Sequence, residues 1–170
     1  TEQTSVNNLA FNSDAPDFGV ACYNDRLIYS TYQGVNQRST GVVRVSNRRG
    51  APSQSHLFAS QRNDQTGEWI EATQLQTDVQ RKSNIGPVQY NESGSMIAFT
   101  KNNFRRGVRQ INEKNNNLAI YLAEVEANGL WDRAKAFPHN GMGYSTTTPC
   151  FSPDGNTLYF ASNMDGGEGG

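Results

Sequence analysis

The sequence has few charged residues, few cysteines and no long apolar run. Charged residues make up 18% of the 170 residues and hydrophobic residues 35%, with a mean hydropathy of −0.72. No stretch approaches the roughly 20 apolar residues that a membrane-spanning helix needs, so we expect no transmembrane segment in this chain. The first residues also lack the basic start and apolar stretch of a signal peptide, as a mature secreted chain would.

Signatures of catalysis and metal binding are missing as well. Cys22 and Cys150 are too few for a disulfide scaffold and have no CxxC spacing. The nucleophile pattern G-x-S-x-G is absent, because Gly143-Tyr144-Ser145 is followed by Thr146 and then by Thr147, where the pattern requires a glycine. His56 and His139 have no second histidine or carboxylate at ligand spacing. We therefore expect no enzyme, no catalytic residue, no metal and no cofactor.

Two short motifs have a structural and a functional interpretation. Residues 152–155, Ser-Pro-Asp-Gly, resemble an Asp box, but the glycine comes one position too early. Pro153 presets φ and Gly155 accepts positive φ, so a type I turn is the favoured interpretation. Residues 165–168, Asp-Gly-Gly-Glu, are predicted to form a hairpin turn. A calcium site completed by other sequence stays open as the alternative.

An internal repeat dominates what the sequence does contain. Residues 84–102 and 146–163 align at an offset of 61, which pairs Tyr90 with Phe151, Gly94 with Gly155, Ile97 with Leu158 and Phe99 with Phe160. A third copy begins earlier, where Gly19 and Tyr23 match Gly86 and Tyr90 at an offset of 67. The later part repeats too, because Gly67, Trp69 and Leu75 match Gly129, Trp131 and Phe137 at 62. One period therefore organises the chain.

Short alternating apolar runs bounded by Gly, Asn, Asp and Pro predict four strands in each repeat. The expected strands are residues 19–23, 26–32, 56–62 and 69–75, then 86–91, 95–101, 118–125 and 131–137, then 148–152 and 157–163. Four-stranded antiparallel units repeated radially are the architecture of a β-propeller, which closes with about four to eight of them. The predicted fold class is all-β, a partial propeller of about two and a half blades.

The repeat also predicts the boundaries of the blades. Residues 12–75 are assigned to blade one, 76–137 to blade two and 138–170 to the first half of blade three. Residues 1–11 are interpreted as the outer strand of a neighbouring blade or as an N-terminal extension. The chain is therefore expected to be a fragment of a larger propeller.

The motifs resemble a known family. SPDGNTLYFAS, residues 152–162, resembles the tight turn and second strand of TolB-like propeller repeats. More narrowly, DFGVACYNDRLIYS, GPVQYNESGSMIAFTKNNF and SPDGNTLYFASNMDGGEGG are similar to the propeller of OmpA-family envelope proteins of Bacteroidetes. That group includes a component of the type IX secretion and gliding apparatus. The resemblance implies a periplasmic, outer-membrane-associated domain that binds other envelope proteins.

The aromatic residues of the repeat are predicted to pack one unit against the next. The set comprises Tyr23, Tyr29, Tyr90, Phe99, Phe151 and Phe160. Cys22 and Cys150 each precede the aromatic residue of an innermost strand. One full unit separates them, so no disulfide between them is expected.

Charge is unevenly distributed along the repeat. Antiparallel connectivity sends successive connections to opposite ends of the sheets. Residues 31–55, 76–85, 101–117 and 138–147 share one end and hold eleven of the fifteen basic residues but two acidic ones, a net charge of +9 against −10 elsewhere. Such a field steers an anionic partner to one side, although solvated loops of no function are the alternative. The predicted partner-binding residues are Arg38, Arg44, Arg48, Arg49, Arg105, Arg106 and Arg109.

The function that these observations favour is a non-enzymatic protein-interaction scaffold of the cell envelope. Its expected partners are envelope proteins, acidic ones included, or an anionic envelope polymer. Nucleic acid is not expected, because no aromatic platform is interleaved with the arginines. The alternative is the propeller of a hydrolase, such as a prolyl-oligopeptidase-like peptidase, whose catalytic domain is not in this chain.

Overall fold

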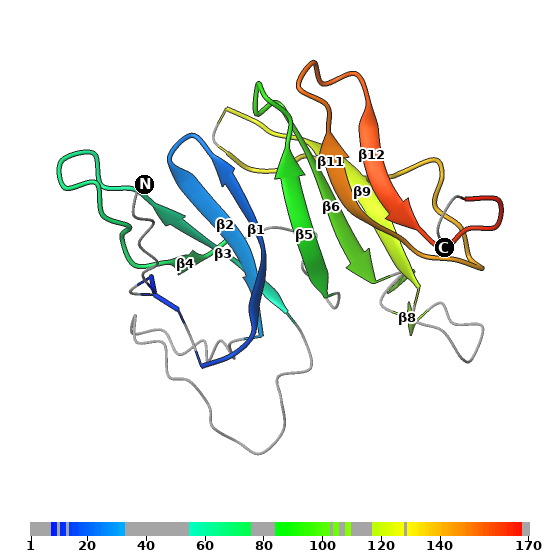
Figure 1. Cartoon of the computed structure of the whole chain (residues 1–170), viewed down its shortest axis with the longest axis horizontal. Coiled ribbons are helices and arrows are strands. Elements are labelled where there is room, and N and C mark those ends of the chain that lie inside the picture. Colours follow the sequence, from blue (N-terminus) through cyan, green and yellow to red (C-terminus); the bar gives the residue numbers. More distant parts are fainter. Residues whose placement is uncertain are drawn as a thin grey trace, which may run out of the picture.

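The computed structural model is all-β (Figure 1). It describes residues 8–9, 11–12, 14–32, 55–75, 84–102, 104–105, 108–109, 117–127 and 129–167. No helix occurs among these residues. The strands are β1 (Asp17–Tyr23), β2 (Arg26–Thr31), β3 (His56–Gln61), β4 (Thr73–Gln74), β5 (Ile85–Tyr90), β6 (Met96–Asn102), β7 (Phe104–Arg105), β8 (Val108–Arg109), β9 (Leu118–Glu124), β10 (Lys135–Ala136), β11 (Thr146–Phe151) and β12 (Leu158–Ser162).

The strands form three antiparallel sheets and one short hairpin. Sheet 1 has the order β1-β2-β3-β4, sheet 2 the order β5-β6-β9-β10, and sheet 3 contains β11 and β12. The hairpin of β7 and β8 lies in the connection between β6 and β9. The predicted four-stranded antiparallel units are confirmed for the first two repeats. No closed propeller is seen among the described residues.

The fourth strands are shorter than the sequence predicts. Each is reduced to two paired residues, β4 and β10, and is preceded by an isolated bridge at the repeated tryptophan. Trp69 bridges to Arg62 and Trp131 bridges to Val125. Edge strands that are short present few unpaired backbone groups, which protects a sheet from unwanted pairing.

The first strand of every sheet carries a β-bulge at the same place. Two residues of the first strand face one residue of the second, at positions 19–20 in β1, 86–87 in β5 and 148–149 in β11. Gly19 and Thr148 have φ values of 66° and 52° there. A repeated bulge bends each first strand in the same way, so the repeat in the sequence is also a repeat in backbone geometry.

The β5–β6 and β11–β12 turns each contain a glycine at the same position of the repeat, and the backbone conformation explains it. Gly94 and Gly155 have φ values of 68° and 71°, and each donates its N–H to a residue three positions earlier, Asn91 O and Ser152 O, at 2.9 Å. Glycine is the residue that adopts this φ without steric cost. The predicted turn at 152–155 is confirmed.

The same hydrophobic cluster forms on one face of sheets 1 and 2. In sheet 1, Leu27, Tyr29 and Phe58 pack together with Trp69 and Ala72. In sheet 2, the repeat-related residues Ile97, Phe99, Tyr121, Trp131 and Ala134 belong to one cluster. Ring pairs recur as well: Tyr29 lies 6.1 Å from Phe58, and Phe99 lies 6.0 Å from Tyr121.

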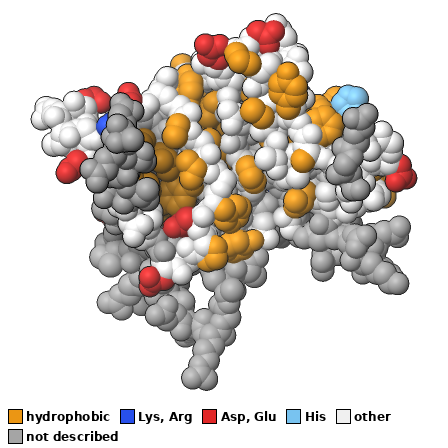
Figure 2. Space-filling model, viewed as in Figure 1, with side chains coloured by type: hydrophobic (Ala, Val, Ile, Leu, Met, Phe, Trp, Pro, Cys, Tyr) orange, Lys and Arg blue, Asp and Glu red, His pale blue; other side chains and the backbone are white. Residues whose placement is uncertain are grey.

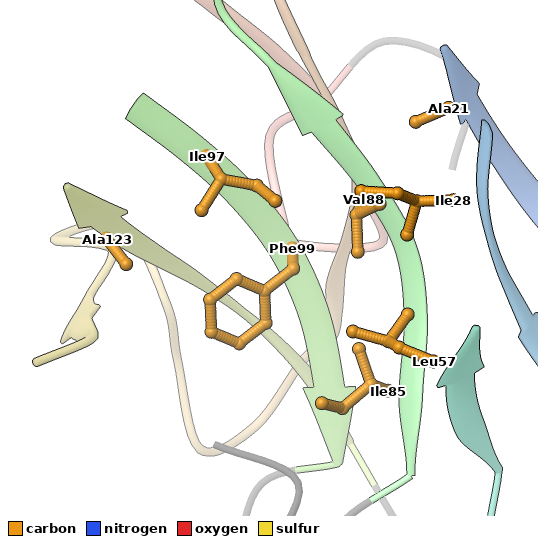
Figure 3. Close-up of a cluster of buried hydrophobic side chains, with 8 residues drawn as sticks. All are labelled: Ala21, Ile28, Leu57, Ile85, Val88, Ile97, Phe99 and Ala123. Atoms are coloured by element: carbon orange, nitrogen blue, oxygen red, sulfur yellow. The ribbon is translucent and has the colours of Figure 1, made fainter. Parts of the chain in front are cut away.

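Sheet 2 is covered on both of its faces. Phe99 shares a core cluster with Ile28 and Leu57 of sheet 1 (Figure 3). The next residue, Thr100, points to the opposite face and accepts a hydrogen bond from the backbone N–H of Thr148 in β11 at 3.1 Å. Because β6 is buried from both sides, the core of the molecule lies between successive sheets and not within one of them.

Hydrogen bonds from buried serines fix sheet 1 to β5. Ser30 Oγ donates to Gly86 O at 3.2 Å, and Ser55 Oγ donates to Ile85 O at 2.9 Å. Both serines are fully buried. Buried hydroxyls that are satisfied in this way specify the position of one sheet on the next.

Candidate functional site

The topology gives each sheet a turn end and a connection end. The connections β1–β2, β3–β4, β5–β6, β9–β10 and β11–β12 lie at the turn end, which is uppermost for sheets 2 and 3 in Figure 1. The connections β2–β3, β4–β5, β6–β9 and β10–β11 join strands at the opposite end, the connection end. Loops on a rigid scaffold are the usual place for binding residues, so both ends are candidate sites.

The structure describes two of the predicted partner-binding arginines, and both lie in the connection between β6 and β9. Arg105 lies in β7 and pairs with Val108, while Arg109 lies in β8 and pairs with Phe104. A two-strand hairpin therefore carries both residues, a feature that the sequence analysis did not predict. Arg38, Arg44, Arg48, Arg49 and Arg106 lie outside the described residues.

Lys101, which the sequence analysis counted with the loop cations, is part of strand β6. Its ammonium group lies 3.9 Å from the centroid of the Tyr121 ring, an arrangement that favours a cation–π contact. Burial lowers the pKa of Lys101 and raises that of Tyr121. This lysine is therefore engaged in packing sheet 2 and is not a free charge at the connection end.

The turn end is acidic. The connections at this end carry eight exposed carboxylates, Asp25, Asp64, Glu68, Glu71, Glu92, Glu126, Asp132 and Asp154. The basic residues in the described part of these connections are Arg62 and Arg133. Two of the acidic patches stand at the upper rim of the molecule, over the turns between β5 and β6 and between β11 and β12 (Figure 2). This end repels anions and attracts cations.

A cleft of about 620 Å³ opens at the turn end between sheets 1 and 2. Its walls include Tyr23, Arg26 and Ile28 from sheet 1 and Tyr90, Val125 and Glu126 from sheet 2. The rings of Tyr23 and Tyr90 stack with their centroids 4.8 Å apart. The sequence analysis placed both tyrosines between units, and the stack confirms it. The cleft itself was not predicted, since it depends on how far apart two sheets stand.

Hydrogen bonds hold both tyrosines of the cleft in place. Tyr23 Oη donates to Ser93 O at 3.0 Å, and Trp131 Nε1 donates to Tyr90 Oη at 3.4 Å. Burial raises the pKa of Tyr90, and the hydrogen bond from Trp131 opposes part of that rise. Tyr90 is therefore neutral at physiological pH. The polar groups that line the cleft are the two phenols, the Arg26 guanidinium, the Glu126 carboxylate, the Asn24 amide and the hydroxyls of Ser93 and Ser95.

Of the two motifs with a structural and a functional interpretation, residues 152–155 form the predicted turn, and residues 165–168 are described only in part. Asp154 accepts hydrogen bonds from Ser152 Oγ and from the Asn156 N–H, and the former, more than the latter, lowers the pKa of its carboxyl group. Within the described residues, no three His, Cys, Asp or Glu side chains gather as a metal site. Asp165 lies in a turn, and Glu168 is outside the described residues.

The two histidines have ordinary structural surroundings. His56 Nδ1 lies 3.2 Å from Gln74 Nε2 across β3 and β4. His139 lies between β10 and β11, with its ring 5.2 Å from Phe137 and 6.5 Å from Phe160. Cys22 and Cys150 are free and exposed.

In the part of the chain that is described, no helix has the length and apolarity needed to cross a membrane. Comparisons with protein-family models, curated proteins and solved structures found no match to this chain.

Proposed function

We propose that this chain is part of a β-propeller that serves as a non-enzymatic scaffold for protein interactions. Its units are of the TolB-like kind, and its sequence resembles the propellers of OmpA-family envelope proteins. On that resemblance we place it in the periplasm, associated with the outer membrane, in the service of type IX protein secretion. The observation that carries the proposal is the repeated packing of each unit on the next.

The end of each fourth strand packs on the second-strand aromatic position of the following unit. Phe137 follows β10 and lies 5.1 Å from Phe160 in β12. Leu75 follows β4 and packs against the cluster that contains Phe99. Phe11 lies 5.6 Å from Tyr29 in the same kind of position. Phe11 therefore supports the interpretation of residues 1–11 as the outer strand of a neighbouring blade.

The arrangement of the first strands also supports a radial fold. β5 contacts β1 and also contacts β11, so the first strands of the three sheets lie next to one another. Blades of a propeller meet through their first strands around a central axis. Each sheet is then covered by its neighbours, which accounts for a chain with 35% hydrophobic residues having a core.

The binding surface that we propose is the basic connection end. Its arginines belong to the connections β2–β3 and β6–β9, and its charge is opposite to that of the turn end. A partner that is an acidic envelope protein or an anionic envelope polymer would be drawn to this end by long-range attraction. The acidic turns at the other end would repel it.

A charge-reversal experiment tests this function. Arg105, Arg106 and Arg109 are replaced together by Glu, and binding to poly-glutamate is measured at several salt concentrations. We expect weaker binding and a flatter salt dependence, because charge attraction is screened over about 8 Å at physiological ionic strength. Circular dichroism should be unchanged, since isolated surface charges contribute roughly 0 to 1 kcal/mol to stability.

The matched control reverses charges at or beside the turn end, with Glu68, Glu124 and Glu126 replaced by Lys. This variant should bind poly-glutamate at least as well as the wild-type chain. Equal weakening of binding in both triple variants, or in neither, would count against the connection end as the binding surface.

A further inference from the structure

The cleft at the turn end between sheets 1 and 2 has the size of a small-ligand site. Its volume of about 620 Å³ lies within the roughly 300 to 1,000 Å³ that such sites span. Its walls come from the β1–β2, β5–β6 and β9–β10 connections and the strand ends beside them. Sheets 1 and 2 both have four strands, so the cleft is formed between two complete units.

Two hydrogen-bond donors line the cleft. Arg26 reaches from sheet 1 to the β9–β10 connection, where its Nη1 atom lies 3.5 Å from the position that a Cβ of Gly129 would take. Burial raises the pKa of Tyr90, while the hydrogen bond from Trp131 and the charge of Arg26 oppose part of that rise. Because Tyr90 Oη accepts the hydrogen bond from Trp131, its own hydrogen can be donated to a ligand.

Both donors depart from the repeat. By the sequence repeat, Arg26 corresponds to Met96 and Tyr90 corresponds to Phe151. The equivalent places between sheets 2 and 3 therefore hold neither a guanidinium nor a phenol. Sheets 2 and 3 nevertheless contact one another. The packing of one unit on the next thus does not account for the two donors.

The charges around the cleft select the class of ligand. A guanidinium and a phenol are donors suited to a carboxylate. The eight exposed carboxylates of the turn end, of which Glu126 lines the cleft, repel a ligand with several negative charges and attract an ammonium group. A ligand that suits both features has one carboxylate and at least one ammonium group.

The tyrosine rings favour a peptide over a saccharide. A sugar ring that stacks on a tyrosine needs an open aromatic face. The rings of Tyr23 and Tyr90 stack on each other, and the Tyr23 ring also lies against Gly94. Ile28 and Val125 add an apolar part to the walls. An aliphatic side chain next to the carboxylate fits such a wall.

We propose that this cleft binds the C-terminal end of a short peptide with an aliphatic last residue. Arg26 and Tyr90 hold the terminal carboxylate, Ile28 and Val125 contact the aliphatic side chain, and the acidic turn end attracts the ammonium groups. The inference goes beyond the proposed scaffold function, because it assigns a second site to the end of the molecule opposite the basic connection end.

The test measures binding of the tripeptide lysyl-alanyl-leucine to the 170-residue chain by isothermal titration calorimetry. The same tripeptide with a C-terminal amide should bind about tenfold more weakly, because a charge-assisted hydrogen bond is lost. Glutamyl-alanyl-leucine should also bind more weakly, because the acidic turn end repels its additional negative charge. In NMR spectra, the free tripeptide should shift the amide signals of Gly94 and Gly129 and leave those of β12 unchanged.

A matched pair of variants separates the cleft from the general charge of this end. Arg26→Gln should bind the free and the amidated tripeptide equally, because the group that distinguishes them is gone. Arg133→Gln removes one positive charge from the same end outside the walls of the cleft, and it should keep the preference for the free carboxylate. Tyr90→Phe should reduce that preference while it keeps the ring stack. Circular dichroism should be the same for all three variants and the wild-type chain.

Four outcomes would overturn the proposal. The first is no binding of the free tripeptide, and the second is equal binding of the free and amidated tripeptides by the wild-type chain. The third is an equal loss of preference in Arg26→Gln and Arg133→Gln. The fourth is displacement of the tripeptide by maltotriose, which would assign the cleft to a saccharide. Replacement of Arg105, Arg106 and Arg109 by Glu should leave tripeptide binding unchanged, so the cleft and the basic connection end can fail independently.

Discussion

At the scale of single residues, a few side chains determine how two units fit together. Tyr23 contacts the β5–β6 turn of the next unit, where its hydroxyl donates to Ser93 O and its ring lies against Gly94. Tyr29 is 4% exposed, although its side chain ends in a hydroxyl group. Both positions lead to predictions that depend on one side chain each.

Gly94→Ala should destabilise the chain by about 1 to 3 kcal/mol, in the range of a substitution that combines backbone strain with a steric clash. Gly94 has a φ of 68°, and a Cβ there would meet the Tyr23 ring and hydroxyl. Gly155→Ala is the matched control, because its φ is 71° but a Cβ would find nothing within 4 Å. Thermal melting should show the larger loss for Gly94→Ala. Equal losses would mean that the Tyr23 contact contributes nothing.

Tyr29 should make the fold sensitive to alkaline pH. Burial, and then the charge of Asp17, raise the pKa of Tyr29 from 10.0 to about 12. Between these values the unfolded chain loses the phenolic proton and the folded chain keeps it, so stability falls as the pH rises. Urea unfolding of wild type and Tyr29→Phe from pH 9 to 12 measures this effect.

The Tyr29→Phe variant should lose less stability over that interval than the wild-type chain. Tyr159→Phe is the control, since Tyr159 is 62% exposed. If Tyr29→Phe and Tyr159→Phe follow the same pH dependence, burial of Tyr29 is not its cause.

At the scale of strands and turns, the length of a hairpin sets the register of the sheet. The β1–β2 turn has two residues, Asn24 and Asp25, and pairs Tyr23 with Arg26. The longer turns of sheets 2 and 3 pair Tyr90 with Ile97 and Phe151 with Leu158. By the sequence repeat, Leu27 corresponds to Ile97, so the first hairpin is shifted by one residue. The second strand keeps its hydrophobic face, but the first strand turns over: Ala21 pairs with Ile28, whereas its repeat equivalent Val88 pairs with Phe99, the equivalent of Tyr29.

The residue after each fourth strand should hold the next sheet in place. Phe137→Ala removes the contact with Phe160 and should cost about 1 to 3 kcal/mol, less than a fully buried phenylalanine because Phe137 is half-buried. Hydrogen exchange should accelerate at β11 and β12 more than in sheet 1. Lys135→Ala, an exposed change in β10, should leave exchange in sheet 3 unaltered. Equal acceleration in all three sheets would contradict a local role.

At the scale of the whole molecule, each sheet buries one face of the sheet that precedes it in the chain. The equivalent positions Ile28, Ala98 and Tyr159 are 2%, 0% and 62% exposed. The first two are covered by the following sheet. In the part of the chain that is described, sheet 3 has no such cover over Tyr159.

The two cysteines provide a test of the order of the three sheets. Cys22 lies in β1 of sheet 1 and Cys150 in β11 of sheet 3, with β5 in contact with both strands. A disulfide needs Cα atoms within about 7 Å. We expect both thiols to remain alkylatable after oxidation of the native chain, as measured by mass spectrometry of non-reduced peptides. A Cys22–Cys150 bond in the folded monomer would contradict the order of the sheets.

Local sequence patterns were enough to predict the strands, the turns and the period of the repeat. Alternating apolar residues and the Gly, Asn and Asp positions are local signals, and they predicted each main strand to within a few residues. The repeated aromatics, among them Tyr23, Tyr90, Phe99 and Phe160, identified residues that pack between units. These features follow from short-range backbone preferences and from side-chain alternation, which any copy of the repeat carries with it.

Features that depend on the distances between sheets could not be predicted from local sequence and required the three-dimensional structure. The β7–β8 hairpin, the engagement of Lys101 with Tyr121 and the cleft beside Tyr23 and Tyr90 have no signal in a single strand. Local sequence specifies the direction of a side chain, but the contact it makes is set by the neighbouring sheet, whose position depends on the packing of all the residues between them.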